Sequence, residues 1–274
     1  MSITDSRPSD QHLRDEWASW HAEREEDLRA PHGWLSLTAL HWLDAEPRTF
    51  DGLPGTWRAS GDGGVEVTAA EGAGLVVGGA PVTSTVRLEP VDGLPGVLVE
   101  VGPRTVEVVR RTDSYALRVR DPEATTLAEF VGVPAFPVDA RWVVDGTFVA
   151  YSQPRRITVG AVVDGLQHFP TAVGVVRFAV DGSEHELVAL QGKAEGLVLH
   201  FRDATSGEST YGGGRVLQVR GADDHGRVRI DFNRTLNLPC AFTASATCPL
   251  PPAENRLAVA VEAGERNPAR PDLG

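Results

Sequence analysis

The sequence predicts a mainly β protein in which antiparallel sheets curl into a barrel or a barrel-like arrangement, with an N-terminal helical cap. Three observations favour this fold class. The chain carries 29 glycines and 19 prolines, a composition typical of many turns. Beyond about residue 55, short valine-rich runs are separated by Gly, Asp and Pro. Several of these runs alternate apolar and polar residues, as strands with one buried face do.

The first predicted element is a helix over residues 9–29. Its apolar residues recur at helical spacing and would share one face, namely Leu13, Trp17, Trp20 and Leu28. Pro31 and Gly33 are expected to end this helix, because proline lacks an amide hydrogen and glycine accepts the backbone conformation that closes a helix.

A second, short helix is expected directly after this turn. Ser36 would be its N-cap, and the side chains facing inward would be Leu37, Leu40 and Leu43. Together these elements assign residues 1–50 to the helical cap and residues 51–274 to a β-barrel-like domain.

The later strands show the clearest alternation. It is cleanest in the runs RVRIDFN (227–233) and RLAVAVE (256–262). In the second run, Glu262 shares one face with two alanines, while leucine and valines share the other. Asp181 with Gly182, and Glu195 with Gly196, predict hairpin turns between neighbouring strands.

The charge and hydropathy of the chain exclude two classes of partner. The net charge is -12, whereas nucleic-acid binding depends on Lys and Arg that neutralise phosphates. A membrane span needs roughly 18 consecutive apolar residues, and no such run occurs. The first residues also lack the pattern of a secretory signal. We therefore expect a cytoplasmic protein with neither a nucleic-acid nor a membrane partner.

The chain contains no complete cofactor motif. The glycines between residues 72 and 79 do not have the spacing of a dinucleotide fingerprint, and those at 212–214 are not followed by the Lys-Ser/Thr of a phosphate loop. Ser209 lies in GESTY, where Tyr211 occupies the place of the second glycine of a nucleophile elbow. No cofactor is expected.

The two cysteines allow more than one interpretation. Cys240 and Cys248 are separated by seven residues, so they do not form the tight C-x2-C pair of a structural zinc site. Zinc would require further ligands from elsewhere in the chain. In a reducing compartment the commonest fate of such cysteines is a small buried side chain, followed by a role as ligand or nucleophile.

Glu262 is the candidate for proton transfer. Its predicted strand face carries alanines, side chains too small to fill a barrel interior, which suggests a cavity beside the carboxylate. Burial there would raise the pKa of Glu262 into the range of a general acid or base. An arginine such as Arg118 or Arg215 could instead pair with it and keep it ionised.

Several blocks of the sequence resemble one family. They are GWLSLTALHWL (33–43), FVGVPAFPVD (130–139), FRDATSGESTYGGGR (201–215), DFNRTLNLPCAF (231–242), CPLPPAENRL (248–257) and EAGE (262–265), and they look like the family called domain of unknown function 1684. Leu236 and Leu238 stand where that family has tyrosine and proline. The resemblance implies a site but no reaction. Its residues here are Arg118, Asp121, Asp203, Tyr211, Arg215, Asp231, Asn233, Asn237, Cys240, Cys248, Asn255, Glu262 and Glu265.

The leading functional hypothesis is a protein that binds or acts on a small polar or anionic molecule in a barrel pocket. Glu262 and Cys240 are its candidate catalytic residues. Its candidate ligand-binding residues are Arg118, Tyr211, Arg215, Asp231, Asn233, Asn237, Asn255 and Glu265. Among them, Arg118 and Arg215 would orient an anionic group of the ligand. Hydrolysis is the first reaction class to consider, because it needs no cofactor motif. Two alternatives stay open: a noncatalytic module whose Cys/Asn-rich loop only locks the fold, and a zinc protein using both cysteines.

Overall fold

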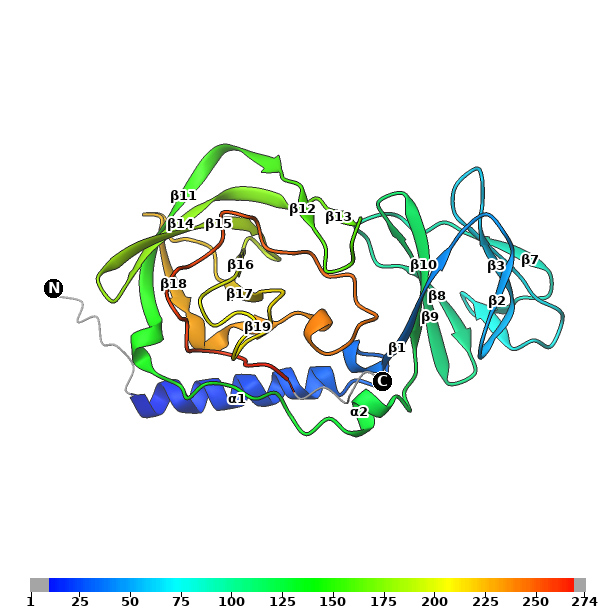
Figure 1. Cartoon of the computed structure of the whole chain (residues 1–274), viewed down its shortest axis with the longest axis horizontal. Helices are drawn as coiled ribbons and strands as arrows, with labels where there is room; N and C mark the ends of the chain where they lie inside the picture. Colours follow the sequence, from blue (N-terminus) through cyan, green and yellow to red (C-terminus); the bar gives the residue numbers. More distant parts are fainter. Residues whose placement is uncertain (1–9, 269–274) are drawn as a thin grey trace.

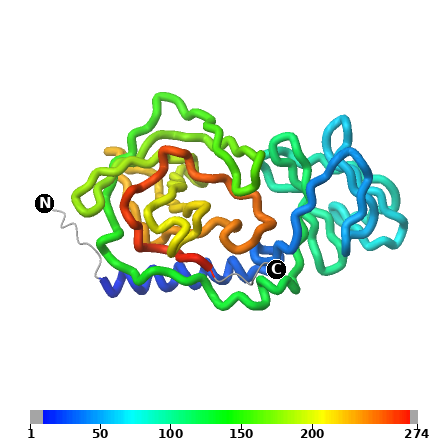
Figure 2. Tube along the Cα trace, viewed as in Figure 1, coloured from blue at the N-terminus to red at the C-terminus, as the bar shows by residue number. Residues whose placement is uncertain are grey.

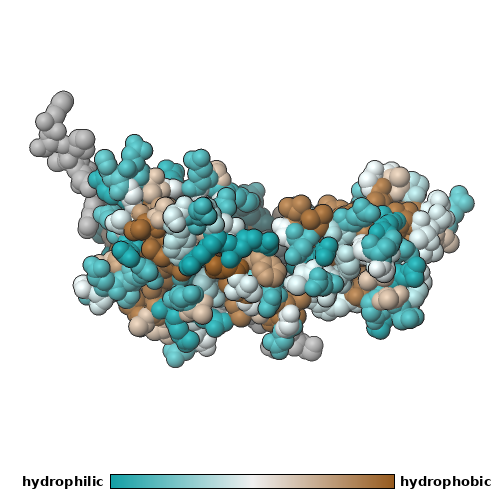
Figure 3. Space-filling model, turned by 90° about the horizontal axis from the view of Figure 1, so that it is seen from above, coloured by the Kyte–Doolittle hydropathy of each residue, from teal (hydrophilic) through white to brown (hydrophobic). Residues whose placement is uncertain are grey.

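The computed structural model describes residues 10–268 and has two lobes arranged along its long axis (Figure 1). Strands account for 43% and helices for 14%, which confirms the predicted mainly β fold class with its curled, barrel-like sheet and its N-terminal helix. Seen from above, a notch on this face separates the lobes, and polar side chains cover most of the surface around it (Figure 3).

The first lobe, on the right of Figure 1, consists of two antiparallel sheets. Their strand orders are β1-β10-β9-β8-β5-β6 and β2-β3-β4-β7. The sheets bury Trp57, Val99 and Val106 in a shared core. The strands are β1 (Leu37–Leu43), β2 (Arg48–Phe50), β3 (Leu53–Ala59), β4 (Val65–Thr68), β5 (Leu75–Val77), β6 (Ala80–Pro81), β7 (Thr85–Leu88), β8 (Val97–Val101), β9 (Arg104–Arg111) and β10 (Ser114–Arg120).

The predicted N-terminal helix is confirmed, and the predicted second helix is wrong. Helix α1 (Asp10–Leu28) buries Leu13 and Leu28 beneath the second lobe (Figure 1). It is followed by the short 3-10 helix η1 (Trp34–Ser36) and then by strand β1. Strand β1 pairs with β10, with His41 opposite Leu117. Tertiary pairing therefore overrides a local leucine spacing that would also have suited a helix.

The second lobe is built on one seven-stranded antiparallel sheet that curls into a half-barrel. Its strand order is β18-β11-β14-β15-β16-β17-β19. Phe178, Phe201 and Phe232 meet in the core inside the curl. The strands are β11 (Val143–Arg156), β14 (Thr171–Val180), β15 (Ser183–Gln191), β16 (Leu197–Phe201), β17 (Arg215–Val219), β18 (Arg227–Asp231) and β19 (Leu236–Asn237).

The smaller elements connect these sheets. Strands β12 (Val159–Gly160) and β13 (Gln167–His168) form a two-stranded ribbon. The short helices are α2 (Thr125–Ala128), η2 (Ala140–Trp142), η3 (Phe232–Arg234) and η4 (Pro239–Ala241). The tight β14–β15 turn predicted at Asp181 and Gly182 is confirmed, since both residues have the positive φ that such a turn requires. Within residues 10–268, no helix combines the length and apolar character that crossing a bilayer requires.

The C-terminal segment crosses the inside of the half-barrel, where the red trace lies in Figure 2. The strand predicted over residues 256–262 is wrong, because no strand forms there. The alternation itself is real: Leu257 and Val261 are buried, and Glu262 is exposed. The backbone of residues 255–259 bonds to the backbone of residues 202–204, and the carbonyls of Val261 and Ala263 accept hydrogen bonds from the buried side chain of Arg215.

Candidate functional site

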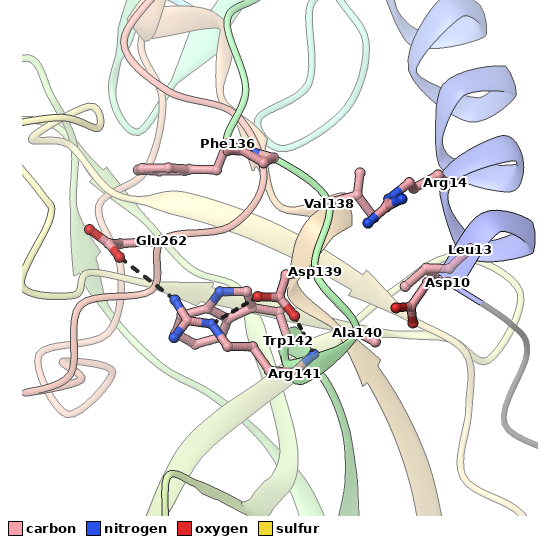
Figure 4. Close-up of a pocket in the computed structure, with 11 residues that line it drawn as sticks. Asp10, Leu13, Arg14, Phe136, Val138, Asp139, Ala140, Arg141, Trp142 and Glu262 are labelled. Atoms are coloured by element: carbon pink, nitrogen blue, oxygen red, sulfur yellow. Dashed lines mark hydrogen bonds and ion pairs between the residues drawn. The ribbon is translucent and has the colours of Figure 1, made fainter.

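A cleft of about 500 Å³ opens between the first turn of α1 and residues 136–142, the segment that leads into the half-barrel. Its lining includes the apolar side chains of Leu13, Phe136, Val138 and Trp142. Charged side chains lie among them, from Asp10, Arg14, Asp139, Arg141 and Glu262 (Figure 4). An apolar wall with a few convergent polar groups is the usual composition of a small-molecule site.

Arg141 is held between two carboxylates. Its Nε lies 3.3 Å from Oδ2 of Asp139, and its Nη2 lies 3.7 Å from Oε2 of Glu262 (Figure 4). The guanidinium also lies over the ring of Trp142, 4.9 Å from the ring centroid. Asp139 caps η2, since its Oδ1 accepts a hydrogen bond from the amide of Arg141 at 2.9 Å. The cap fixes the carboxylate and the guanidinium relative to each other.

Asn233 fixes the backbone behind this pair. Its Oδ1 accepts from the amide of Asp139 at 3.1 Å, and its Nδ2 donates to the carbonyl of Asp139 at 3.0 Å. The same Nδ2 lies 2.9 Å from Oδ1 of Asp231, which also accepts from the amide of Asn233. Asn233 is buried and saturated. It therefore holds the backbone of Asp139 from the buried side of the cleft, where a ligand would not reach it.

Arg215 fixes the backbone of the segment that carries Glu262. Its guanidinium donates to the carbonyls of Val261, Ala263 and Glu265 at 2.9, 2.6 and 3.0 Å. It also donates to Oδ2 of Asp203 at 2.8 Å. Val261 and Ala263, its neighbours on either side, are buried, so the side chain of Glu262 points away from the core.

Two further buried groups attach α1 and the C-terminal segment to the same network. Oε1 of Glu265 lies 3.2 Å from Nε of Arg24 on α1, and Oε2 accepts from the amide of Asn237 at 2.6 Å. Burial raises the pKa of Glu265, and the charge of Arg24 opposes this. Asn255 bonds the amide and carbonyl of Val188 and the carbonyl of His200, so it holds the segment against β15 and β16.

The expected convergence of Glu262 and Cys240 does not occur. The side chain of Glu262 is 59% exposed at the mouth of the cleft. Cys240 is buried in a separate apolar cluster with Cys248, Ala246 and Tyr211. The cavity predicted beside Glu262 is thus an open cleft, and burial does not act on this carboxylate.

Neither arginine expected to orient an anion lies in the cleft. Arg215 is fully buried and occupied by carbonyls and Asp203. Arg118 is buried where the lobes meet, with Nη2 donating to Oγ1 of Thr247 at 3.0 Å and Nη1 lying 3.5 Å from Oε2 of Glu107. The anion-orienting role predicted for these two residues has no geometric support.

The alternative of a zinc site at Cys240 and Cys248 would need further ligands beside the two cysteines. Both cysteines are buried, and neither forms a disulfide. Within the described part of the chain, no group of three or more His, Cys, Asp or Glu side chains could hold a metal ion.

Sequence reasoning missed most of the cleft. Asp139 ends one of the family-like blocks, yet it was not singled out, and Arg141, Arg14 and Asp10 carried no motif. A usable signal was present in Asp139-Ala140-Arg141, because an aspartate two residues before an arginine can cap the turn that holds it.

Comparisons with known proteins agree with five of the six sequence blocks, those between residues 130 and 265, and the block at 33–43 lies outside the matched region. The family described as "Protein of unknown function (DUF1684)" matches residues 128–266, which contain Asp139, Arg141 and Glu262. The solution NMR structure of an uncharacterized protein from Haloarcula marismortui is 30% identical, with a TM-score of 0.43, over 51% of this chain and 78% of that chain. No curated protein matches the sequence.

Proposed function

We propose that this chain, which belongs to the DUF1684 family of proteins of unknown function, binds a small polar molecule in the cleft between α1 and residues 136–142. The observation that carries the proposal is that the buried polar network bonds to the two segments that line the cleft. Asn233 fixes Asp139, and Arg215 fixes the segment of Glu262, so two costly buried groups set the geometry of one exposed site.

The charges of the cleft favour a ligand that carries an anionic group. Arg14 points from α1 toward Val138 and Asp139 (Figure 4). Within residues 10–268, no hydrogen bond or ion pair engages Arg14, so its guanidinium is available to a carboxylate or phosphate. Glu262 and Asp139 already share Arg141 and would accept hydrogen bonds from the other end of the ligand.

The lining favours binding over covalent catalysis. Among the described residues that line the cleft, none is Ser, Thr, Cys, His, Lys or Tyr, so only its carboxylates could act as nucleophile or proton shuttle. Two of these carboxylates, Asp139 and Glu262, already pair with Arg141. Hydrolysis therefore has weaker support than binding. In this proposal the Asn and Arg residues of the family blocks stabilise the fold.

A cytoplasmic location forms part of the proposal. Its support is the pair of buried cysteines, which lie next to each other without a disulfide, as is typical of proteins kept in a reducing compartment.

A thermal-shift screen of small carboxylates, phosphates and zwitterions, followed by calorimetric titration of the hits, tests the proposal. Arg14→Ala and Glu262→Gln should weaken binding of a hit roughly tenfold or more, the size of one lost charge-assisted hydrogen bond. Their melting temperatures should stay close to that of the parent, because both side chains are exposed.

The matched control is Glu186→Gln. Glu186 forms an exposed ion pair with Arg177 on β14 and β15, outside the cleft, with a side chain about as exposed as that of Glu262. This variant should bind every hit as the parent does. Hits whose affinity is the same in Arg14→Ala, Glu262→Gln and the parent would place binding elsewhere and contradict the proposal.

A further inference from the structure

The two cysteines of the chain form a buried pair in the segment 240–248. This segment, orange in Figure 1, lies on the side of the second lobe that faces β1. The amide of Cys240 donates to Sγ of Cys248 at 3.3 Å. Ala246, Val162 and Leu238 pack around the two sulfur atoms. The thiols are therefore neighbours in a dry apolar pocket.

The pKa of the Cys248 thiol is raised. A hydrogen bond with the Cys240 side chain and then burial raise it, while the charge of Arg118 acts in the opposite direction. Cys248 therefore keeps its proton at neutral pH, which leaves Cys240 as the thiol to react first.

The same segment joins the lobes. Oγ1 of Thr247 accepts from Arg118 of β10 at 3.0 Å, and Oγ1 of Thr243 lies 3.4 Å from the carbonyl of Leu37. The carbonyl of Thr247 lies 2.7 Å from Nε2 of His168 on β13. Any covalent closure of residues 240–248 acts directly on contacts that hold β10 against the second lobe.

We propose that Cys240 and Cys248 are a modification site, oxidised by a peroxide to a reversible disulfide that tightens the junction between the lobes. The Cys240 thiolate attacks one oxygen of hydrogen peroxide, which breaks the O–O bond and leaves a sulfenic acid and hydroxide. The Cys248 sulfur then attacks the sulfenic sulfur, and its proton leaves with the hydroxyl as water. In total two thiols and one peroxide give one disulfide and two waters.

The closed ring would limit the motion of Thr243 and Thr247, which carry the bonds to the first lobe. We therefore expect slower amide hydrogen exchange in β10 after oxidation, because exchange there requires the lobe contact to open. Reduction by dithiothreitol restores the faster exchange.

Intact mass spectrometry of the full chain treated with hydrogen peroxide tests the bond. The expected product is about 2 Da lighter than the reduced chain, has lost both free thiols, and regains them with dithiothreitol. Phenylarsine oxide, a probe that bridges two adjacent thiols, should bind the reduced chain one to one. Wild-type protein that keeps both thiols, or that gains oxygen without losing hydrogen, overturns the proposal. This readout does not depend on any variant folding.

The chain has only two cysteines, so each single variant is a clean control. Cys240→Ser and Cys248→Ser cannot lose the two hydrogens and should not retain phenylarsine oxide. Thr247→Val keeps both thiols and removes the hydroxyl that binds Arg118. It should still form the disulfide, but β10 should gain much less protection. Equal protection of β10 in Thr247→Val would contradict the link to the lobe junction.

Discussion

Arg215 and Asp203 form an ion pair at 2.8 Å in which both side chains are fully buried. Burial lowers the pKa of Arg215, and Asp203 opposes this shift. Three further N–H groups of the guanidinium donate to the backbone carbonyls of Val261, Ala263 and Glu265, and Nε has no partner within the described residues. One buried cation thus holds the backbone on both sides of Glu262.

Replacing Arg215 by Met should destabilise the protein by about 3–5 kcal/mol, because Asp203 is then left as an uncompensated buried charge. Urea unfolding at neutral pH measures this loss. Arg177→Met is the control, since Arg177 forms an exposed ion pair and its loss should cost less than about 1 kcal/mol. A small loss for Arg215→Met would show that the C-terminal segment holds its path by apolar packing alone.

Asn255→Leu should cost about 3 kcal/mol, because the amide of Val188 and the carbonyls of Val188 and His200 lose their partner inside the protein. Asn255→Asp should also be costly, since a carboxylate cannot donate to either carbonyl. Chemical denaturation of both variants provides the comparison. Asn267→Ala removes one bond from an exposed asparagine and should change stability by about 0.5 kcal/mol or less.

Gly264→Ala should destabilise by at least about 2 kcal/mol. Gly264 has φ of +74°, and an added Cβ would lie 2.5 Å from the carbonyl oxygen of Thr235. Gly72 offers a matched control because its φ is +79° and an added Cβ meets nothing within 4 Å. Gly72→Ala should therefore show only the backbone cost of about 1 kcal/mol. Equal melting temperatures for the two variants would contradict the close approach at Gly264.

His200 should make the protein less stable in mild acid. Burial lowers the pKa of His200 to about 3, so the unfolded chain takes up a proton below about pH 6.5 that the folded protein refuses. Above about pH 6.5, His200 is neutral in both the folded and the unfolded chain, and it does not lower the free energy of unfolding. As the pH falls from there toward about 3, the pKa of His200 in the folded protein, the free energy of unfolding falls by about 1.4 kcal/mol per pH unit.

His200→Leu should remove this dependence. Between about pH 7 and pH 5, the wild-type free energy of unfolding should fall by about 2 kcal/mol more than that of the variant. His225→Leu, at an exposed position, should follow the wild-type curve. If His200→Leu followed that curve as well, the acid sensitivity would come from other groups.

The sequence predicted the fold class and the first helix because both depend on short-range patterns. The spacing of Leu13 and Leu28 and the alternation in residues 227–233 are visible without a partner strand. Leu37–Leu43 shows the limit: its leucine spacing suits a helix, and only pairing with β10 makes it a strand.

The site was less accessible to the same reasoning. The alternation over residues 256–262 correctly separated Val261 from Glu262, but it could not reveal that Arg215 would hold the carbonyls. Once the segment lies inside the half-barrel, Glu262 points into solvent beside Arg141. Long-range side-chain contacts, which no local pattern encodes, therefore decided which polar residues support the cleft and which line it.

The attachment of α1 also has a consequence for synthesis of the chain on the ribosome. Strands β1–β10 can complete their own core while translation continues. Helix α1 is made before these strands, yet it binds Asn233, Asn237 and Glu265, which are made after them. We expect proteolysis of stalled nascent chains to find residues 37–120 protected early and α1 cleaved until residue 265 has left the exit tunnel. Helix α1 then docks after the strands that follow it in sequence, and a chaperone has that whole interval in which to bind it.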